Sequence, residues 1–204
     1  MAGGTRRERE KALHRREISE AAKRVFARKG FAAATVDEIA QEAEFSKGAM
    51  YVHFESKEDL FLCLIQEKLD DLEERLGKVV TSSEDPETKI IDLVKTYLTF
   101  FEEDRDFFQI IASEQPRLGV ETENQLKENM RERYICDLNL IEEVMKDGVS
   151  KRILKAMDPR LLARGLVGII HSFTAHWILT DGNDPLTEME PVILDLFLDG
   201  ARAQ

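Results

Sequence analysis

The sequence predicts an all-α protein, in which a small N-terminal head of three helices is followed by a larger helical bundle, with about nine helices in total. Apolar residues recur at helical spacing through most of the chain, and no segment alternates with the two-residue period of a strand. Only five prolines occur among 204 residues, and a hydrophobic content of 43% is enough to build apolar cores. These three observations favour a helical fold.

The first helix is predicted to begin at about Lys11 and to end at Gly30. Its apolar positions follow the i, i+3, i+4, i+7, i+8 series of an amphipathic helix. Residues 1–9 precede this pattern, and we expect them to form a flexible basic arm. Its arginines suit a minor groove or neighbouring phosphates, and they equally suit a solvated tail. The apolar positions are Ile18, Ala21, Ala22, Val25 and Phe26, and the arginines are Arg6, Arg7 and Arg9.

Two short helices and a longer one are expected next. Thr35 and Glu38 form a T-x-x-E capping box, which predicts a helix of about two turns. Ser46 is a natural N-cap for the following helix, and Ser56 is one for a fourth. The predicted segments are therefore a helix-turn-helix domain at 10–55, a connecting helix at 56–79 and a second domain at 80–204.

The second domain is predicted to be a helical bundle. The polar stretch Thr81–Pro86 ends the connecting helix. Beyond it, helical periodicity resumes in five segments that are separated by turns containing proline or glycine. These segments are about 87–103, 105–113, 119–147, 159–180 and 187–202.

The segment Phe45–Phe54 carries the strongest functional signal in the chain. Three of its apolar residues are spaced to anchor a helix on its neighbours, which leaves a small, polar face outward. A lysine on that face can donate to guanine or to phosphate, and an alanine can contact a thymine methyl group. We interpret the segment as the second helix of a helix-turn-helix that enters a DNA major groove; an ordinary solvated helix is the alternative. The anchors are Phe45, Met50 and Phe54, and the outward residues are Lys47, Gly48, Ala49, Tyr51 and His53.

Charge is distributed unevenly along the chain, whose net charge is −11. Residues 1–60 carry 12 basic and 11 acidic side chains, whereas residues 61–204 carry 17 and 29. The acidic remainder should be repelled by nucleic acid. Only the N-terminal end is therefore suited to a DNA-binding face.

At these residues the chain resembles the TetR family of bacterial transcriptional regulators, which implies a homeodomain-like head and a TetR-like bundle. The resemblance covers about residues 14–62 and rests on Thr35-Val-Asp-Glu-Ile-Ala40, Ser46-Lys-Gly-Ala-Met-Tyr51 and Ser56-Lys57-Glu58. It implies that Ser46, Lys47, Gly48 and Ala49 approach base edges, while Thr35, Tyr51, His53 and Lys57 contact phosphates. Glu44 departs from the family pattern, which usually has glycine in the turn. If that turn requires positive φ, a glutamate there is strained.

The resemblance also implies a homodimer that binds a double-stranded, approximately palindromic operator and responds to a small molecule. The dimer would form through the last two helices, by way of Leu162, Leu166, Ile169, Phe173, Ile193, Leu196 and Phe197. Aromatic and soft side chains suit a mainly apolar effector site, although a plain hydrophobic core would use the same residues. This second set comprises Phe100, Phe107, Phe108, Met130, Tyr134, His171 and Trp177.

A dimeric repressor released by a mostly apolar effector is the leading interpretation, and a DNA-bound scaffold regulated by a protein partner is the alternative. An enzyme is disfavoured, because the sequence holds no phosphate-binding loop, dinucleotide fingerprint or hydrolase elbow. No cofactor or metal is expected, since His171 and His176 are five residues apart and lie on different helix faces. No apolar run approaches the ~20 residues that span a bilayer, so we expect a cytoplasmic protein without membrane contact.

Overall fold

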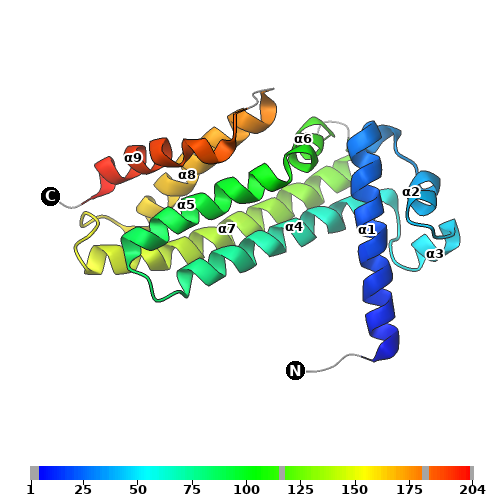
Figure 1. Cartoon of the computed structure of the whole chain (residues 1–204), viewed down its shortest axis with the longest axis horizontal. Coiled ribbons are helices and arrows are strands. Elements are labelled where there is room, and N and C mark those ends of the chain that lie inside the picture. Colours follow the sequence, from blue (N-terminus) through cyan, green and yellow to red (C-terminus); the bar gives the residue numbers. More distant parts are fainter. Residues whose placement is uncertain (1–4, 115–117, 181–183, 203–204) are drawn as a thin grey trace. The chain divides into compact units, whose positions relative to one another are not determined.

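The computed structural model describes residues 5–114, 118–180 and 184–202, and within these ranges it consists of nine α-helices and one short 3-10 helix, without a β-sheet (Figure 1). The all-α prediction is confirmed. Contacts divide the chain into two units. The head unit comprises Met1–Lys68 and Gln109–Lys127, and the bundle unit comprises Leu69–Phe108 and Glu128–Gln204.

The first helix of the head unit, α1 (Arg6–Ala33), begins earlier than the sequence predicts. Thr5 and Glu8 form a capping box, in which the Thr5 hydroxyl accepts from the Glu8 amide and the Glu8 carboxylate accepts from the Thr5 amide. The prediction of an arm at 1–9 is therefore wrong for residues 6–9, because capping starts the helix before the apolar pattern does. Residues 1–4 lie outside the described residues.

Gly30 interrupts α1 where the helix was predicted to end. Its φ of +75° lies in a region that side chains with a Cβ avoid. A Cβ added at this position would also come within 3.0 Å of the Glu114 carboxylate oxygen Oε1. Gly30 therefore lets the chain turn and lets α6 approach it, and one further turn of helix follows to Ala33.

The two predicted short helices are α2 (Val36–Glu42) and α3 (Lys47–Tyr51). The predicted caps are confirmed: Thr35 and Glu38 form a capping box, and the Ser46 hydroxyl accepts from the Ala49 amide at 3.1 Å. The helix α3 is only five residues long, and His53 and Phe54 lie beyond its C-terminal end. The α2–turn–α3 arrangement is that of a helix-turn-helix.

The turn between α2 and α3 contains Glu44 in the left-handed region, with a φ of +59°. This is the conformation in which a glycine is relaxed and a glutamate is strained.

Replacing Glu44 with glycine is expected to raise the free energy of unfolding by about 1 kcal/mol relative to Glu44→Ala, because both variants lose the carboxylate and only glycine relieves the backbone. Urea denaturation of the two variants measures the difference. Equal stability of the glycine and alanine variants would contradict the strain.

The longer helices follow the predicted order closely. They are α4 (Lys57–Val80), α5 (Pro86–Glu103), α6 (Arg105–Glu114), α7 (Val120–Ser150), α8 (Pro159–Leu179) and α9 (Glu190–Ala201), with the 3-10 helix η2 (Leu186–Met189) before α9. The side chains of Asp85 and Asp158 cap α5 and α8, and each is followed by a proline in the first turn. No helix within the described residues is long and apolar enough to cross a membrane.

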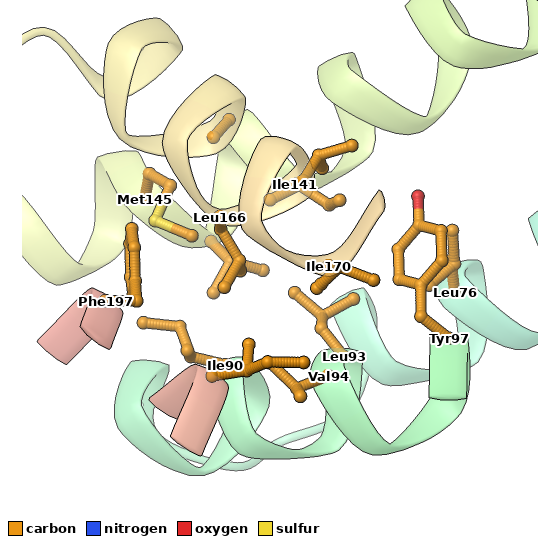
Figure 2. Packing of buried hydrophobic residues seen from close by; sticks show 14 of the residues in the cluster. Leu76, Ile90, Leu93, Val94, Tyr97, Ile141, Met145, Leu166, Ile170 and Phe197 are labelled. Carbon is orange, nitrogen blue, oxygen red and sulfur yellow. The ribbon is translucent and has the colours of Figure 1, made fainter. Parts of the chain in front are cut away.

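The core of the bundle unit brings together α4, α5, α7, α8 and α9 (Figure 2). Ile90, Leu93 and Leu166 are among its fully buried side chains. Tyr97 is buried with them, and it places a hydroxyl in a cluster of otherwise apolar side chains.

The two units divide the chain differently from the predicted segments at 10–55, 56–79 and 80–204. The boundary falls within α4, after Lys68, and residues 109–127 group with the N-terminal helices. Ile111, Leu118 and Leu126 are buried in this returning segment. No local sequence pattern in residues 109–127 indicates that they pack with the head unit.

Candidate nucleic-acid interface and effector region

The helix α3 presents one exposed face, which comprises Lys47, Gly48 and Tyr51. Tyr51 is 50% exposed, whereas Met50 and Phe54 are 2% and 4% exposed. Phe45 is partly buried, and its ring centroid lies 5.0 Å from that of His14 on α1. The predicted anchors therefore hold the segment, and of the predicted outward residues Lys47, Gly48 and Tyr51 are exposed whereas Ala49 is half-buried.

Lys47 and Gly48 determine what the exposed face of α3 can bind. The Lys47 ammonium forms an ion pair with Asp37 at 2.8 Å, which also raises its pKa. An exposed pair of this kind is weak, so the lysine can exchange Asp37 for a phosphate or a base. The nearest atom that a Cβ at Gly48 would meet is the Ser46 hydroxyl oxygen at 3.9 Å. Packing within the chain does not require this glycine, and the open space around it would allow the predicted close approach of another molecule.

Thr35 and Ser46 lie exposed at the starts of α2 and α3. Each hydroxyl oxygen accepts a bond from an amide of its own helix, at 3.3 Å from Glu38 and 3.1 Å from Ala49. The hydroxyl hydrogens and the first amides of both helices can still donate to phosphate oxygens.

His53 faces the head unit more than the solvent. Its imidazole is half-buried, its Nδ1 has no hydrogen-bond partner, and its ring centroid lies 5.9 Å from that of His14. Burial, together with the positive charges of His14, Lys11 and Arg15, lowers the pKa of His53. It is therefore neutral at pH 7, and a phosphate contact would use a neutral N–H donor.

Lys57 points back into the head unit. Its ammonium donates to the carbonyl oxygens of Phe31 at 2.8 Å and Ala34 at 2.9 Å, and it lies 4.4 Å from the centroid of the Phe31 ring. It thereby satisfies carbonyl groups that the end of α1 leaves open. The structure thus gives the residue a role in fastening α4 to α1, which competes with the phosphate contact that the sequence predicts.

Arg15 on α1 also joins segments within the head unit. Its position in the sequence did not predict this role. Its guanidinium donates to the His53 carbonyl at 3.2 Å and to the Cys63 sulfur at 2.8 Å, and it lies 4.5 Å above the Phe54 ring. Arg15 therefore ties α1 to the end of the α3 segment and to α4.

The Lys57→Met variant is expected to bind DNA of every sequence more weakly, with an unchanged slope of log K against log salt. The reason is that the ammonium already lies on carbonyl oxygens and so displaces no phosphate counterion. Lys47→Met is the matched control and should reduce the slope by about 1. Filter-binding titrations at several salt concentrations measure both slopes. A reduced slope for Lys57→Met would instead assign it the phosphate contact.

In the bundle unit, four phenylalanines meet where α5 and α6 adjoin. Phe100 is fully buried, and its ring centroid lies 5.4 Å from that of Phe108, which lies 5.8 Å from that of Phe107. Phe101 completes the group, at 4.6 Å from Phe108. Three predicted effector residues are thus brought together as an aromatic cluster.

Within the described residues, no ring contact joins the other four predicted effector residues to this cluster. Tyr134 and His171 face each other with ring centroids 5.7 Å apart, and Met130 is 46% exposed on α7. Trp177 lies beneath the Arg105 guanidinium at 4.3 Å and donates from Nε1 to the Asp184 carbonyl. A cavity of about 290 Å³ lies elsewhere, and none of the seven predicted residues lines it; its walls are Ile135, Leu138, Asn139, Glu142, Arg160, Ala163 and Arg164.

Sequence reasoning missed a buried polar group in the same unit. The Tyr97 hydroxyl donates to the Asp137 carboxylate at 3.1 Å, and His171 lies beside Tyr97 with a centroid distance of 6.1 Å. Tyr97 and Asp137 are 40 residues apart, so no local motif joins them. Only the periodicity that places both on inward helix faces could have suggested the pair.

The predicted dimer residues differ widely in how exposed they are in the single chain. Leu162, Leu166, Ile193 and Phe197 are at most 5% exposed because the helices of their own unit already cover them, so they have little surface left for a partner. Ile169 and Phe173 are partly buried against the same core. Leu196 alone of the seven is strongly exposed. The exposed apolar side chains on α8 and α9 are Leu161, Leu179, Val192 and Leu196.

A helix-turn-helix with an exposed lysine–glycine–tyrosine face, carried by a chain with a separate all-helical unit, defines the class of DNA-binding transcriptional regulators. Two family models match the chain. "Bacterial regulatory proteins, tetR family" matches residues 18–64, and "Tetracyclin repressor-like, C-terminal domain" matches residues 83–201. The protein belongs to the TetR family of transcriptional regulators, which confirms the resemblance.

Several relatives are similar over nearly the whole chain. The fatty acid metabolism regulator protein of Bacillus subtilis is 23% identical over 185 residues, which cover 90% of this chain and 93% of that protein. The transcriptional activator FasR of Mycolicibacterium smegmatis is 28% identical and covers 88% and 80%.

Two solved structures share the fold. The fatty acid degradation regulator FadR from Bacillus halodurans has a TM-score of 0.77 and 26% identity, and covers 94% of this chain and 97% of its own. FadR from Bacillus subtilis, solved in complex with stearoyl-CoA, has a TM-score of 0.73 and 24% identity, with 90% and 97% covered.

Proposed function

We propose that the protein is a dimeric repressor, which binds a palindromic operator through α3 of each subunit and is released by an effector of the fatty acyl-CoA class, in which an apolar acyl chain is joined to a charged CoA group. The observation that carries the proposal is the division of the α3 segment into buried anchors and an exposed face. Met50 and Phe54 fix the helix, and Lys47, Gly48 and Tyr51 are left to meet a major groove.

Relatives and composition support the effector class. Two similar proteins regulate fatty acid metabolism or degradation, and one structure of the same fold holds stearoyl-CoA. The aromatic cluster around Phe100 and Phe108 makes the interior of the bundle unit strongly apolar where α5 and α6 adjoin, although Phe100 itself is fully buried. An acyl chain is the kind of ligand that such an interior binds.

The exposed apolar side chains on α8 and α9 support dimerisation. Leu161 and Leu196 are both more than half exposed, which is costly unless a second surface covers them. A two-fold dimer would present its α3 helices to successive major grooves about 34–36 Å apart, which explains the expected palindrome. The effector must then bind the released state more tightly than the operator-bound state.

A gel-shift assay with DNA from upstream of the protein's own gene tests the proposal. We expect preference for a palindromic site over random duplex at moderate salt, an altered base preference in Lys47→Ala, and release on addition of stearoyl-CoA. Absence of any sequence preference would overturn operator binding. Sequence-specific binding that stearoyl-CoA and shorter acyl-CoAs leave unchanged would overturn the effector class alone.

A DNA-bound scaffold regulated by a protein partner is the second candidate. Met130, Tyr134 and Ile135 favour it, because all three lie at least 37% exposed within a short stretch of α7. Under this alternative, no acyl-CoA would raise the melting temperature, and Met130→Glu would abolish regulation without affecting DNA binding.

A further inference from the structure

The core of the bundle unit contains a buried polar pair, Tyr97 and Asp137. A purely apolar ligand would gain nothing from it. Tyr97 is fully buried and Asp137 is 8% exposed, and their side chains share a hydrogen bond of 3.1 Å. Figure 2 shows Tyr97 at one end of the labelled core cluster. Two leucine-sized apolar residues would fill this space without the cost of burying polar atoms.

The nearby Arg133 cation offsets only part of the cost of burying Asp137. No ion pair joins it to a residue in the described ranges, and the nearby Arg133 guanidinium is instead paired with Asp70 and Glu73. Burial raises the pKa of Asp137 to about 6, and the Tyr97 hydrogen bond offsets only part of this. The carboxylate is therefore kept at a cost to stability, which points to a role in binding.

Two polar groups on α8 extend this site. His171 makes no hydrogen bond with the described residues, and its ring lies beside both Tyr97 and Tyr134. Thr174 lies one helical turn further along the same face; it is 3% exposed, and its hydroxyl has no hydrogen-bond partner. A buried hydroxyl without a partner calls for a ligand or a water that satisfies it.

The donors and acceptors that remain unpaired in this site determine which chemical group of a ligand can bind there. The Tyr97 hydrogen is used by Asp137, so this pair offers only lone pairs and requires a donor. Burial lowers the pKa of His171, which is therefore neutral and can both donate and accept; the Thr174 hydroxyl can do the same. A carbonyl lacks the donor that Asp137 requires, and an ammonium lacks an acceptor for His171 or Thr174. A hydroxyl supplies both.

We infer that the effector carries a hydroxyl group on its apolar part, which donates to Asp137 and accepts from His171 or Thr174. The inference rests on the proposed release by an acyl-CoA and narrows that class to hydroxylated acyl chains.

Isothermal titration of the full-length protein with stearoyl-CoA and with hydroxystearoyl-CoA isomers, substituted near the thioester or at mid-chain, tests the inference. At least one isomer should bind about 10- to 100-fold more tightly than stearoyl-CoA, which is the range for a hydrogen bond to a charged group. In Asp137→Ala and Thr174→Val that preference should shrink by about tenfold or more, while the affinity for stearoyl-CoA changes little.

Ser172→Ala is the matched control, because Ser172 lies exposed on the same helix between His171 and Thr174. It should keep the full preference. If Asp137→Ala fails to fold, Thr174→Val still tests the site. Equal affinity for all acyl-CoAs in the wild type would overturn the inference and leave the proposed effector class standing. No binding of any acyl-CoA would overturn both.

Discussion

Replacing Asp137 with asparagine is expected to raise the free energy of unfolding at pH 8 by about 3 kcal/mol, since one pKa unit corresponds to about 1.4 kcal/mol. The pKa of this carboxyl is about 6 in the folded protein against an ordinary value of 3.8, mainly because burial disfavours the charged form. Asparagine has nearly the same shape, still accepts from Tyr97, and carries no charge to desolvate.

The sign follows from proton binding. The folded state holds the Asp137 proton more tightly than the unfolded state, so ionisation costs stability as the pH rises from about 4 to above 6, and the full cost is present above that range. The advantage of Asp137→Asn should therefore be small at pH 4 and should reach its limit above about pH 7. Urea denaturation at several pH values measures it, with exposed Asp195→Asn as the control. A difference that does not vary with pH would contradict this account.

Replacing Leu196 with glutamate is expected to dissociate the proposed dimer and to lower operator affinity by about 100-fold or more. A charge placed on an apolar interface must be desolvated, and the two-fold axis brings in a second copy of it. Loss of the dimer also removes the gain from binding two half-sites at once, which is worth about 10²–10⁴ in affinity.

Light scattering measures the dimer, and gel shift measures the affinity. Val120→Glu is the control, because Val120 is also exposed, at 76%, but lies at the start of α7 rather than on α8 or α9. An undiminished dimer in Leu196→Glu would place the interface on another face.

The sequence predicts this fold well where local chemistry decides it. Side-chain caps at Thr35, Ser46 and Ser56 start helices where predicted, because a cap acts within three residues. The strain at Glu44 was predictable for the same reason, since the turn of a helix-turn-helix dictates its own φ. The exposed face of α3 follows from helical spacing.

Features that depend on packing between distant segments were not predictable. Apolar periodicity identified the apolar stripes of α8 and α9 but could not say which of their residues meet the core of their own unit, and four of the seven predicted dimer residues belong to that core. Lys57 was recognised as a cation, yet its carbonyl partners lie more than 20 residues away. The Tyr97–Asp137 pair spans two helices, and neither residue is unusual where it stands.

The helix α4 runs through the boundary between the units, with Lys57–Lys68 in the head unit and the remainder in the bundle unit. This crossing is therefore continuous hydrogen-bonded helix rather than a loop that tolerates length changes. The other two boundaries between the units also fall within helices, α6 and α7, so an exchange of head units between relatives would require splices inside three helices at constant length. One residue inserted in α4 would turn the helix positions beyond it by about 100° and move buried leucines such as Leu72 and Leu76 off their apolar face. The length of this helix is therefore constrained together with its apolar residues.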